Sequence, residues 1–340
     1  MGNVTMRDIG RMMGVSAVTV SKALAGKSGV SEEMRRKIIR TAQELGYVNP
    51  NASQGRALQG LDVGILVPDH YFSPDSFYAM LYKQLVQALT EAGHFGILEL
   101  LGQEAESSLA LPNLIRSRHV DALVLLGQPR QEYVRMIARQ DTPVVFLDFY
   151  DESAEADAVV GDNAYGCYRL TSHLIKNGHR DIGFVGDRKA TSSIMDRYLG
   201  FYRAMLMNDL PIREECILID RDARSQRRTL ALPEKLPTAF VCNCDIVAQW
   251  LIEQLSQMGL RVPEDVSVTG FDDFLPSGTS EPALSTFRLD SRAMAQMTVR
   301  LINERCSGVD KPFGRFVVGG EPLYRNSDIP LNQTTIKEER

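Results

Sequence analysis

From residue 63 onward, short runs of apolar residues, many of them β-branched, alternate with longer segments of helical length. Continuous apolar runs are typical of strands buried on both faces of a parallel sheet, with helices covering those faces. Roughly 270 residues of this pattern are too many for one sheet, so the sequence predicts two. The expected strands are residues 63–67, 96–100, 122–126, 144–147, 182–185, 239–242 and 266–270, and the expected helices are residues 77–92, 165–176, 197–208, 245–258 and 292–305.

The first 60 residues differ from the rest of the chain in charge. They carry nine basic and four acidic side chains, a net charge of +5, although the whole chain has a net charge of −5. A basic head on an acidic body is the charge layout of a DNA-binding module joined to a domain that binds another ligand. We therefore expect nucleic acid to bind at the N-terminal end.

Three short helices are expected within this basic head. The first covers residues 6–13 and ends at Gly14, as a C-cap glycine allows. Ser16 is a good N-cap for the second helix, residues 17–24, and Ser31 starts the third. The residues expected to form the shared apolar centre of the head are Ile9, Met12, Met13, Val20, Leu24, Met34, Ile38, Ala42 and Leu45.

The second of these helices has the character of the recognition helix of a helix-turn-helix, which enters the major groove of DNA. Lys22 either bonds a guanine edge or meets only a phosphate, and Ala17 and Val18 suit contacts with thymine methyl groups. Hydroxyl side chains suit phosphate contacts, which set the register on DNA. The candidate DNA-contacting residues of the head are Thr5, Ser16, Ala17, Val18, Thr19, Ser21 and Lys22.

Five short segments of the head resemble the headpiece of the LacI/GalR (lactose-repressor-like) family of bacterial transcription regulators. They are residues 4–9 (VTMRDI), 14–16 (GVS), 19–21 (TVS), 30–31 (VS) and 45–47 (LGY). The resemblance implies a homodimer that binds palindromic double-stranded operator DNA. Such a dimer doubles the few base contacts that one head can make.

A hinge helix follows the headpiece in this family, normally with the pattern Tyr-x-Pro-Asn-x-x-Ala-Arg-x-Leu. Here the corresponding stretch from Tyr47 to Leu58 is two residues longer, and Gly55 replaces the expected alanine. A glycine weakens a helix by roughly 1 kcal/mol relative to alanine. The resemblance nevertheless places Arg56 and Leu58 among the DNA contacts, with Leu58 as a wedge in the minor groove.

The resemblance also implies a body of two lobes, like that of periplasmic sugar-binding proteins, in which the chain crosses between lobes three times. The first lobe is expected at residues 61–158 and 290–316, and the second at residues 159–289 and 317–330. The polar tail has no leucine heptad, so no coiled-coil tetramer is expected. The predicted domains are the helix-turn-helix head at 1–48, the hinge at 49–60, the effector-binding and dimerisation body at 61–330 and the tail at 331–340.

Ligands of open parallel sheets bind beyond the carboxyl ends of the strands, so the residues just after the expected strands are candidates for an effector site. In the family, the positions that match Arg197, Asn243 and Asp272 bind the effector, often through sugar hydroxyls. Charged planar groups can each engage two hydroxyls, and aromatic rings cover the apolar face of a sugar. The candidate effector-binding residues are Asp69, Phe72, Phe77, Ser193, Arg197, Asn243 and Asp272.

Two features near these candidates have open interpretations. Asp162 and Asp245 also follow expected strands, but a structural role, as a helix cap or in a pair between the lobes, is favoured over ligand contact. The arginine-rich segment 221–228 is either a solvated face or the mark of an anionic effector such as a sugar phosphate, since arginine suits phosphate.

Several protein classes are disfavoured by what the sequence does not contain. The five histidines have no metal-ligand spacing, and no nucleophile elbow, P-loop or dinucleotide fingerprint occurs. We therefore expect no metal, no cofactor and no enzymatic activity. The five scattered cysteines suit a reducing compartment, and there is neither a signal-peptide pattern nor an apolar run of about 18 residues. We expect a cytoplasmic bacterial protein without a membrane partner.

The predicted function is that of a dimeric DNA-binding repressor whose operator affinity is switched by a small, sugar-like and possibly phosphorylated metabolite between the lobes. Effector affinity must differ between two states of the protein for such a switch to work. Two alternatives remain at this point. One is a cytosolic sugar-binding sensor without specific DNA binding, and the other is a regulator with a protein corepressor.

Overall fold

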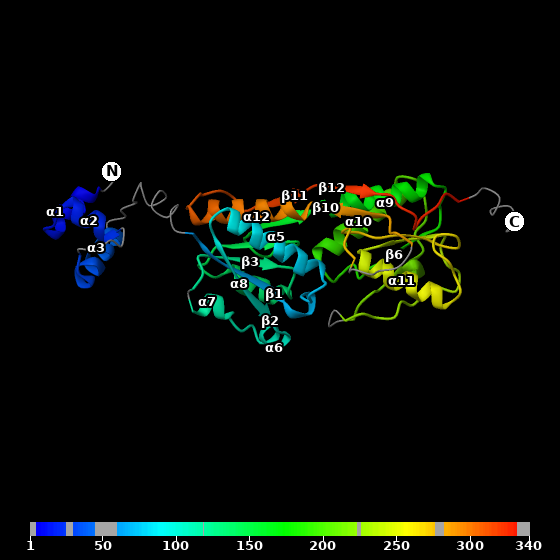
Figure 1. Cartoon of the computed structure of the whole chain (residues 1–340), viewed down its shortest axis with the longest axis horizontal. Coiled ribbons are helices and arrows are strands. Elements are labelled where there is room, and N and C mark those ends of the chain that lie inside the picture. Colours follow the sequence, from blue (N-terminus) through cyan, green and yellow to red (C-terminus); the bar gives the residue numbers. More distant parts are fainter. Residues whose placement is uncertain are drawn as a thin grey trace. The chain divides into compact units, whose positions relative to one another are not determined.

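The computed structural model describes residues 5–24, 30–44, 60–117, 119–222, 226–275 and 282–331. The chain divides into two units, residues 1–60 and 61–340 (Figure 1). Within the described residues, no helix is both long and apolar enough to cross a membrane.

The first unit contains α1 (Met6–Met13), α2 (Ala17–Leu24) and α3 (Glu32–Glu44). Gly14 ends α1 with a φ of 67°, which suits glycine. The amide of Thr19 donates to Ser16 Oγ over 3.0 Å, so Ser16 caps α2 as the sequence predicts. A Cβ atom on Gly10 would lie 2.7 Å from the carbonyl oxygen of Val15, so the tight turn between α1 and α2 requires a glycine there.

The core of the first unit corrects one expectation. Ile9, Val20, Ala23, Ile38 and Ala42 are buried together. Met12 is 67% exposed, contrary to prediction. Met13, four residues after Ile9, packs against this core instead, because residues four apart share a helix face. The side chain of Leu24 and the whole of Leu45 lie outside the described part of the chain.

The larger sheet of the second unit has six parallel strands in the order β11-β5-β4-β3-β1-β2. One face is covered by α5 (Phe77–Glu91) and α12 (Ser291–Cys306), which pack against each other, and the other face by α8 (Gln131–Ala138) (Figure 1). The strands are β1 (Asp62–Pro68), β2 (Phe95–Leu101), β3 (Ala122–Leu126), β4 (Val144–Leu147), β5 (Asp157–Gly161) and β11 (Arg315–Val318).

The smaller sheet has four parallel strands in the order β7-β6-β8-β9. Its helices are α9 (Asn163–Lys176) and α10 (Ser192–Leu206) on one face and α11 (Asp245–Gln257) on the other. Thr191 Oγ1 accepts from the amide of Ile194 and starts α10 five residues earlier than expected. The strands are β6 (Ile182–Val185), β7 (Ile217–Leu218), β8 (Ala239–Cys242) and β9 (Ser267–Thr269).

The chain passes between the two sheets three times. Two of the passages run through β10 (Thr286–Leu289) and β12 (Gly320–Leu323), which pair antiparallel. The expected crossing points after residues 158 and 316 are wrong by a few residues. They fall inside β5 and β11, which pair with each other up to Gly161 and Val318, and the chain leaves the sheet only where that ladder ends.

Short elements complete the described structure. Among them are the 3-10 helices η1 (Asp69–Tyr71) and η2 (Glu214–Cys216) and the helices α6 (Gln103–Ser107) and α7 (Asn113–Arg116). Of these, η1 directly follows β1 and therefore lies at the carboxyl end of the larger sheet, where a ligand is expected.

Candidate functional site

A cavity of about 120 Å³ lies between the two lobes, where the carboxyl ends of their strands face each other. Its residues come from both sheets, as the rule for ligand sites in parallel sheets predicts. Its lining includes Tyr71, Phe77, Tyr78 and Asp148 from the first lobe and Thr191, Ser193, Ile194, Arg197, Arg221, Asn243, Cys244, Ile246, Asp272 and Phe274 from the second.

Five of the seven candidate effector residues are brought together here, namely Phe77, Ser193, Arg197, Asn243 and Asp272. The other two lie elsewhere. Asp69 lines a larger cavity of about 720 Å³, which shares Tyr71 with the smaller one. Phe72 lines neither cavity, because its ring packs edge-on against Tyr82 with 5.6 Å between the ring centres.

Arg197 is the centre of the site and is only 4% exposed. Its Nε donates to Asn163 Oδ1 over 2.8 Å, and its Nη1 donates to the carbonyl oxygen of Asn243 over 2.6 Å. Its Nη2 lies 3.0 Å from Asp272 Oδ1, and its Cζ lies 4.1 Å from the centre of the Phe271 ring. Burial by itself lowers the pKa of Arg197, but nearby carboxylates, Asp272 first, outweigh it and raise the pKa. The guanidinium is therefore a fixed positive charge.

Two carboxylate oxygens of the cavity lining have no hydrogen-bond partner among the described residues, namely Asp272 Oδ1, which lies 3.0 Å from Arg197 Nη2, and an oxygen of Asp148. Asp148 Oδ2 accepts from the hydroxyl of Tyr78 over 2.9 Å, while the buried Oδ1 of Asp148 has no hydrogen-bond partner among the described residues. Burial raises the pKa of Asp148 to about 7, opposed in part by the charge of Arg197. An unpaired buried polar atom is costly, so this oxygen favours a ligand that donates a hydrogen bond.

Contacts across the cleft hold the lobes together near Asp148. Ser193 Oγ in α10 donates to the carbonyl oxygen of Asp148 over 2.6 Å. The Oε1 atom of Gln128 accepts from the amide of Ser192 over 2.7 Å, and the hydroxyl of Tyr150 donates to Asp196 over 3.0 Å. The start of α10 is thus bound to the strand ends of the first lobe, and the lobes are closed over the cavity.

The arginine-rich segment after β7 does not behave as one unit. Arg221 lines the cavity, but its Nε and Nη2 donate to the fully buried Asp220 over 3.0 and 2.6 Å. Arg227 lies over the ring of Trp250 and binds Glu253 at the surface. Of these two arginines, Arg221 is therefore compensated by Asp220 and Arg227 is bound at the surface away from the cavity.

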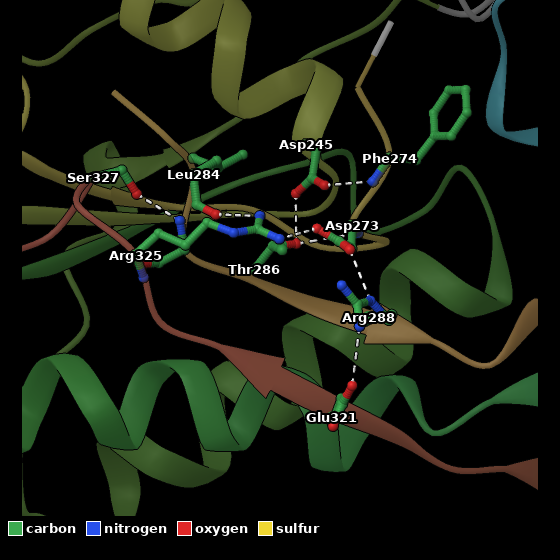
Figure 2. Close-up of polar contacts among 10 residues, drawn as sticks. Asp245, Asp273, Phe274, Leu284, Thr286, Arg288, Glu321, Arg325 and Ser327 are labelled. Atoms are coloured by element: carbon green, nitrogen blue, oxygen red, sulfur yellow. Dashed lines mark hydrogen bonds and ion pairs between the residues drawn. The ribbon is translucent and has the colours of Figure 1, made fainter. Parts of the chain in front are cut away.

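The side chains of Asp162 and Asp245 have structural partners, as favoured from the sequence. Asp162 caps α9 by accepting from the amide of Tyr165. Asp245 accepts from the Thr286 hydroxyl over 2.6 Å and from the Phe274 amide over 2.8 Å, which fixes the loop after β9 (Figure 2). Neither carboxylate lines the cavity.

Sequence reasoning missed several lining residues. Asp148 directly follows an expected strand, so the rule that found Asp272 would have found it too. Tyr78 lies on α5 next to Phe77, and no strand end marks it. Tyr71 and Phe274 lie in short irregular segments whose direction the sequence pattern does not give.

In the head, Thr5 precedes α1, and the other candidate DNA residues of the head are Ser16, which caps α2, and residues of α2 itself. Val18 is 64% exposed, and Thr5, Ser16, Ser21 and Lys22 are also exposed. Ala17 and Thr19 are half-buried, and the hydroxyls of Ser16 and Thr19 lie 2.8 Å apart. Arg56 and Leu58 of the hinge lie outside the described residues.

Comparison with known proteins separates the same two parts of the chain. A family model described as "Bacterial regulatory proteins, lacI family" matches residues 5–51, and one described as "Periplasmic binding protein-like domain" matches residues 171–327. The HTH-type transcriptional repressor PurR of Vibrio parahaemolyticus is 29% identical over 336 residues, covering 96% of this chain and 99% of that protein. The HTH-type transcriptional regulator MalR of Streptomyces coelicolor is also 29% identical, covering 95% of this chain and 96% of that protein.

Solved structures share the fold. A complex of the transcriptional regulator CelR with cellobiose has a TM-score of 0.68 at 23% identity, covering 96% of this chain and all of that one. The lac repressor dimer bound to operator and the anti-inducer ONPF has a TM-score of 0.65 at 21% identity, with the same coverage. The predicted fold class, a helix-turn-helix head joined to a periplasmic-binding-protein-like α/β body, is confirmed. The chain therefore belongs to the lacI family of bacterial regulatory proteins and is a DNA-binding transcriptional regulator.

Proposed function

We propose that this regulator is a repressor that acts in the cytoplasm as a homodimer on palindromic operator DNA, without enzymatic activity, and that its effector is a small sugar-like molecule bound between the lobes. The observation that carries the effector site is the buried pair of Arg197 and Asp272, which lines a cavity made by both lobes. Two structural neighbours, by their titles, hold cellobiose and ribose.

The chemistry of the cavity supports a ligand rich in hydroxyl groups. Asp148 Oδ1 needs a donor, and Asp272 presents a second carboxylate beside Arg197. The rings of Phe77, Tyr78 and Phe274 supply apolar surface of the kind that covers a sugar ring. Polar groups at fixed positions within aromatic walls are typical of small-molecule sites.

The charges of the cavity favour a neutral sugar over its phosphate. Arg197 faces Asp272, and Arg221 is bound to Asp220, so both guanidinium groups are already compensated. Asp148 then adds a further carboxyl group without a cation of its own. A phosphate placed here would find no uncompensated cation beside the carboxyl group of Asp148, so its charge would be buried without a partner, which disfavours binding.

An exposed apolar edge supports the homodimer. In the larger sheet β2 is an edge strand, paired only with β1 among the described strands. Phe95 and Ile97 of β2 are 66% and 37% exposed, and they share a face because they are two residues apart. Exposed apolar edges of sheets mark interaction surfaces. The variant Phe95→Asp should therefore shift the full chain from dimer to monomer, as measured by sedimentation velocity.

A thermal-shift screen of the full chain tests the effector site. Matched pairs of neutral sugars and their phosphates, such as ribose with ribose 5-phosphate, are compared at equal concentration. A neutral sugar at about 100 times its Kd should stabilise the chain by roughly 3 kcal/mol, and its phosphate by less. Arg197→Ala should abolish this shift. Arg261→Ala, which removes only an exposed ion pair with Asp265 in the same lobe, is the matched control.

Retention of the full shift in Arg197→Ala would remove this residue, and the cavity around it, from the effector site. A larger shift with the phosphate would reverse the charge assignment of the ligand. Operator affinity is measured in parallel by fluorescence anisotropy, with and without each stabilising ligand, at one stated salt concentration because binding to DNA depends strongly on salt.

A further inference from the structure

Two adjacent carboxylates after β9 have different partners. The carboxylate of Asp272 is buried in the cavity beside Arg197, whereas that of Asp273 does not line the cavity. The oxygens of Asp273 instead accept from Arg288 on β10 and from Arg325, which follows β12 (Figure 2). We propose that Asp273 is a positioning residue that couples the effector cavity to the crossing strands β10 and β12. This inference rests on the proposed effector site at Asp272.

The contacts of Asp273 define what we name the crossover clamp, formed by Asp273, Arg288, Arg325 and Glu321. Asp273 Oδ2 accepts from Arg288 Nε over 2.8 Å, and its Oδ1 accepts from Arg325 Nη2 over 2.6 Å. Arg288 lies in β10 and also donates to Glu321 of β12 over 3.1 Å. Arg325 follows β12 and donates to the carbonyl oxygen of Leu284 over 2.8 Å. One carboxylate thus joins the loop after β9 to both crossing strands.

The backbone of the same loop is fixed against β10. Asp272 and Asp273 have φ angles of 98° and 52°, in a region that residues other than glycine rarely adopt, so tertiary contacts must hold them there. The amide of Asp272 donates to the carbonyl oxygen of Phe287 over 2.9 Å, and the amide of Asp273 donates to Thr286 Oγ1 over 3.3 Å. The backbone contacts therefore keep the loop in register with β10, and the side chain of Asp273 adds the link to both crossing strands.

From β10 the path leads into the first lobe. After β10 the chain enters α12, and Asp290 caps that helix by accepting from the amide of Ala293 over 2.8 Å. In turn α12 packs against α5 and against the strands β4 and β5. Because α5 contributes Phe77 and Tyr78 to the cavity, the packing of α12 against α5 connects the crossing strands to the cavity residues of the first lobe.

The coupling is tested on the full chain without any ligand, by hydrogen–deuterium exchange and a double-mutant cycle. Asp272→Asn disturbs the cavity side of the loop. It should speed the exchange of amides in residues 286–289 and 320–323 by roughly three- to tenfold in the wild-type background. In the Asp273→Asn background, Asp272→Asn should speed the exchange of the same amides by less than about twofold. The reason is that the crossover clamp no longer transmits the change.

Three further variants separate coupling from loss of structure. Asp273→Glu keeps the carboxylate and should restore most of the response to Asp272→Asn. Asp265→Asn removes an exposed ion pair with Arg261 in the same lobe and should leave the response unchanged. Where Asp272→Asn fails to fold, Arg197→Lys disturbs the same cavity pair and replaces it in the cycle.

An equal exchange response to Asp272→Asn in the wild-type and Asp273→Asn backgrounds would overturn the proposal. The cycle needs no effector, so its outcome is separate from the thermal-shift screen. Failure of every sugar to bind at Arg197 would remove the proposed effector site while leaving a measured link between Asp272 and the crossing strands in place.

Discussion

The two lobes contribute different kinds of groups to the cavity. The second lobe presents a bonded frame, in which Arg197 is held by Asn163, Asn243 and Asp272. The first lobe presents the rings of Phe77 and Tyr78 and the carboxyl group of Asp148, whose Oδ1 has no partner among the described residues. The bonded guanidinium of Arg197 fixes orientation, whereas an open acceptor between rings leaves room for a ligand. Substitutions that break the frame should therefore lower the free energy of unfolding more than substitutions on the first lobe.

The largest effect is expected for Arg197→Ala. This substitution leaves Asp272 buried without its cation, and breaking a buried ion pair from one side costs about 3–5 kcal/mol of unfolding free energy. Urea denaturation of the full chain measures the loss, with Arg261→Ala as the control, because an exposed ion pair contributes little to stability. A loss for Arg197→Ala no greater than that of the control would contradict the picture of a rigid frame.

On the first lobe, Asp148→Asn should change the pH dependence of stability. Burial raises the pKa of Asp148 from 3.8 to about 7, so the folded chain holds this proton more tightly than the unfolded chain. The stabilising contribution is fully present below pH 4 and is lost as the pH rises through 7. Relative to Asp148→Asn, the wild type should lose up to about 4 kcal/mol between pH 4 and pH 8. Parallel stability curves for the two proteins would show that Asp148 titrates normally.

A smaller loss is expected for Tyr78→Phe, which removes the hydroxyl that donates to Asp148 Oδ2. A lost partner of a buried carboxylate costs about 1–3 kcal/mol. The loss should be greater at pH 8 than at pH 5, because the ionised carboxylate needs the donor more than the protonated one. Urea denaturation at the two pH values measures this loss of unfolding free energy. Equal losses at both pH values would show that the contribution of Tyr78 does not depend on the charge of Asp148.

The smallest effect is expected for Tyr150→Phe, which removes one contact between the lobes without touching the cavity lining. Its hydroxyl donates to Asp196 over 3.0 Å, and a single hydrogen bond of this kind contributes about 0.5–1.5 kcal/mol. The closed arrangement should become less favoured, so amides at the start of α10 should exchange faster by hydrogen–deuterium exchange. Unchanged exchange in residues 192–197 would show that the lobes are held by other contacts.

Much of the fold could be predicted because it depends on local patterns. Continuous apolar runs predicted both parallel sheets, and Ser16 and Gly14 correctly marked the boundaries of α1 and α2. Helix phase was harder, since Met12 and Met13 are equally apolar and only packing decided that Met13 faces the core. The crossing points after residues 158 and 316 were also misplaced, because strand pairing and not composition sets where β5 and β11 stop.

The candidate site was predictable where a residue follows a strand. That rule brought Ser193, Arg197, Asn243 and Asp272 to one cavity, because the carboxyl ends of parallel strands lie at one edge of each sheet. Tyr78 was missed because its place depends on how α5 packs. Phe72 was wrongly included because its ring turns toward Tyr82. For such residues the direction of the side chain, and not its position along the chain, decides whether it lines the cavity.

By itself the sequence determined the family, the helix-turn-helix head, the two parallel sheets and the edge at which their polar residues gather. The sheets, the helices and this edge follow from local spacing and periodicity, whereas the family and the candidate Asp272 follow from the resemblance. Only the tertiary structure decided the different partners of Asp272 and its identical neighbour Asp273. Asp272 meets Arg197, and Asp273 meets Arg288 and Arg325, because contacts with β10 hold both residues at positive φ. That conformation is unfavourable in the isolated chain, so no local pattern can predict it.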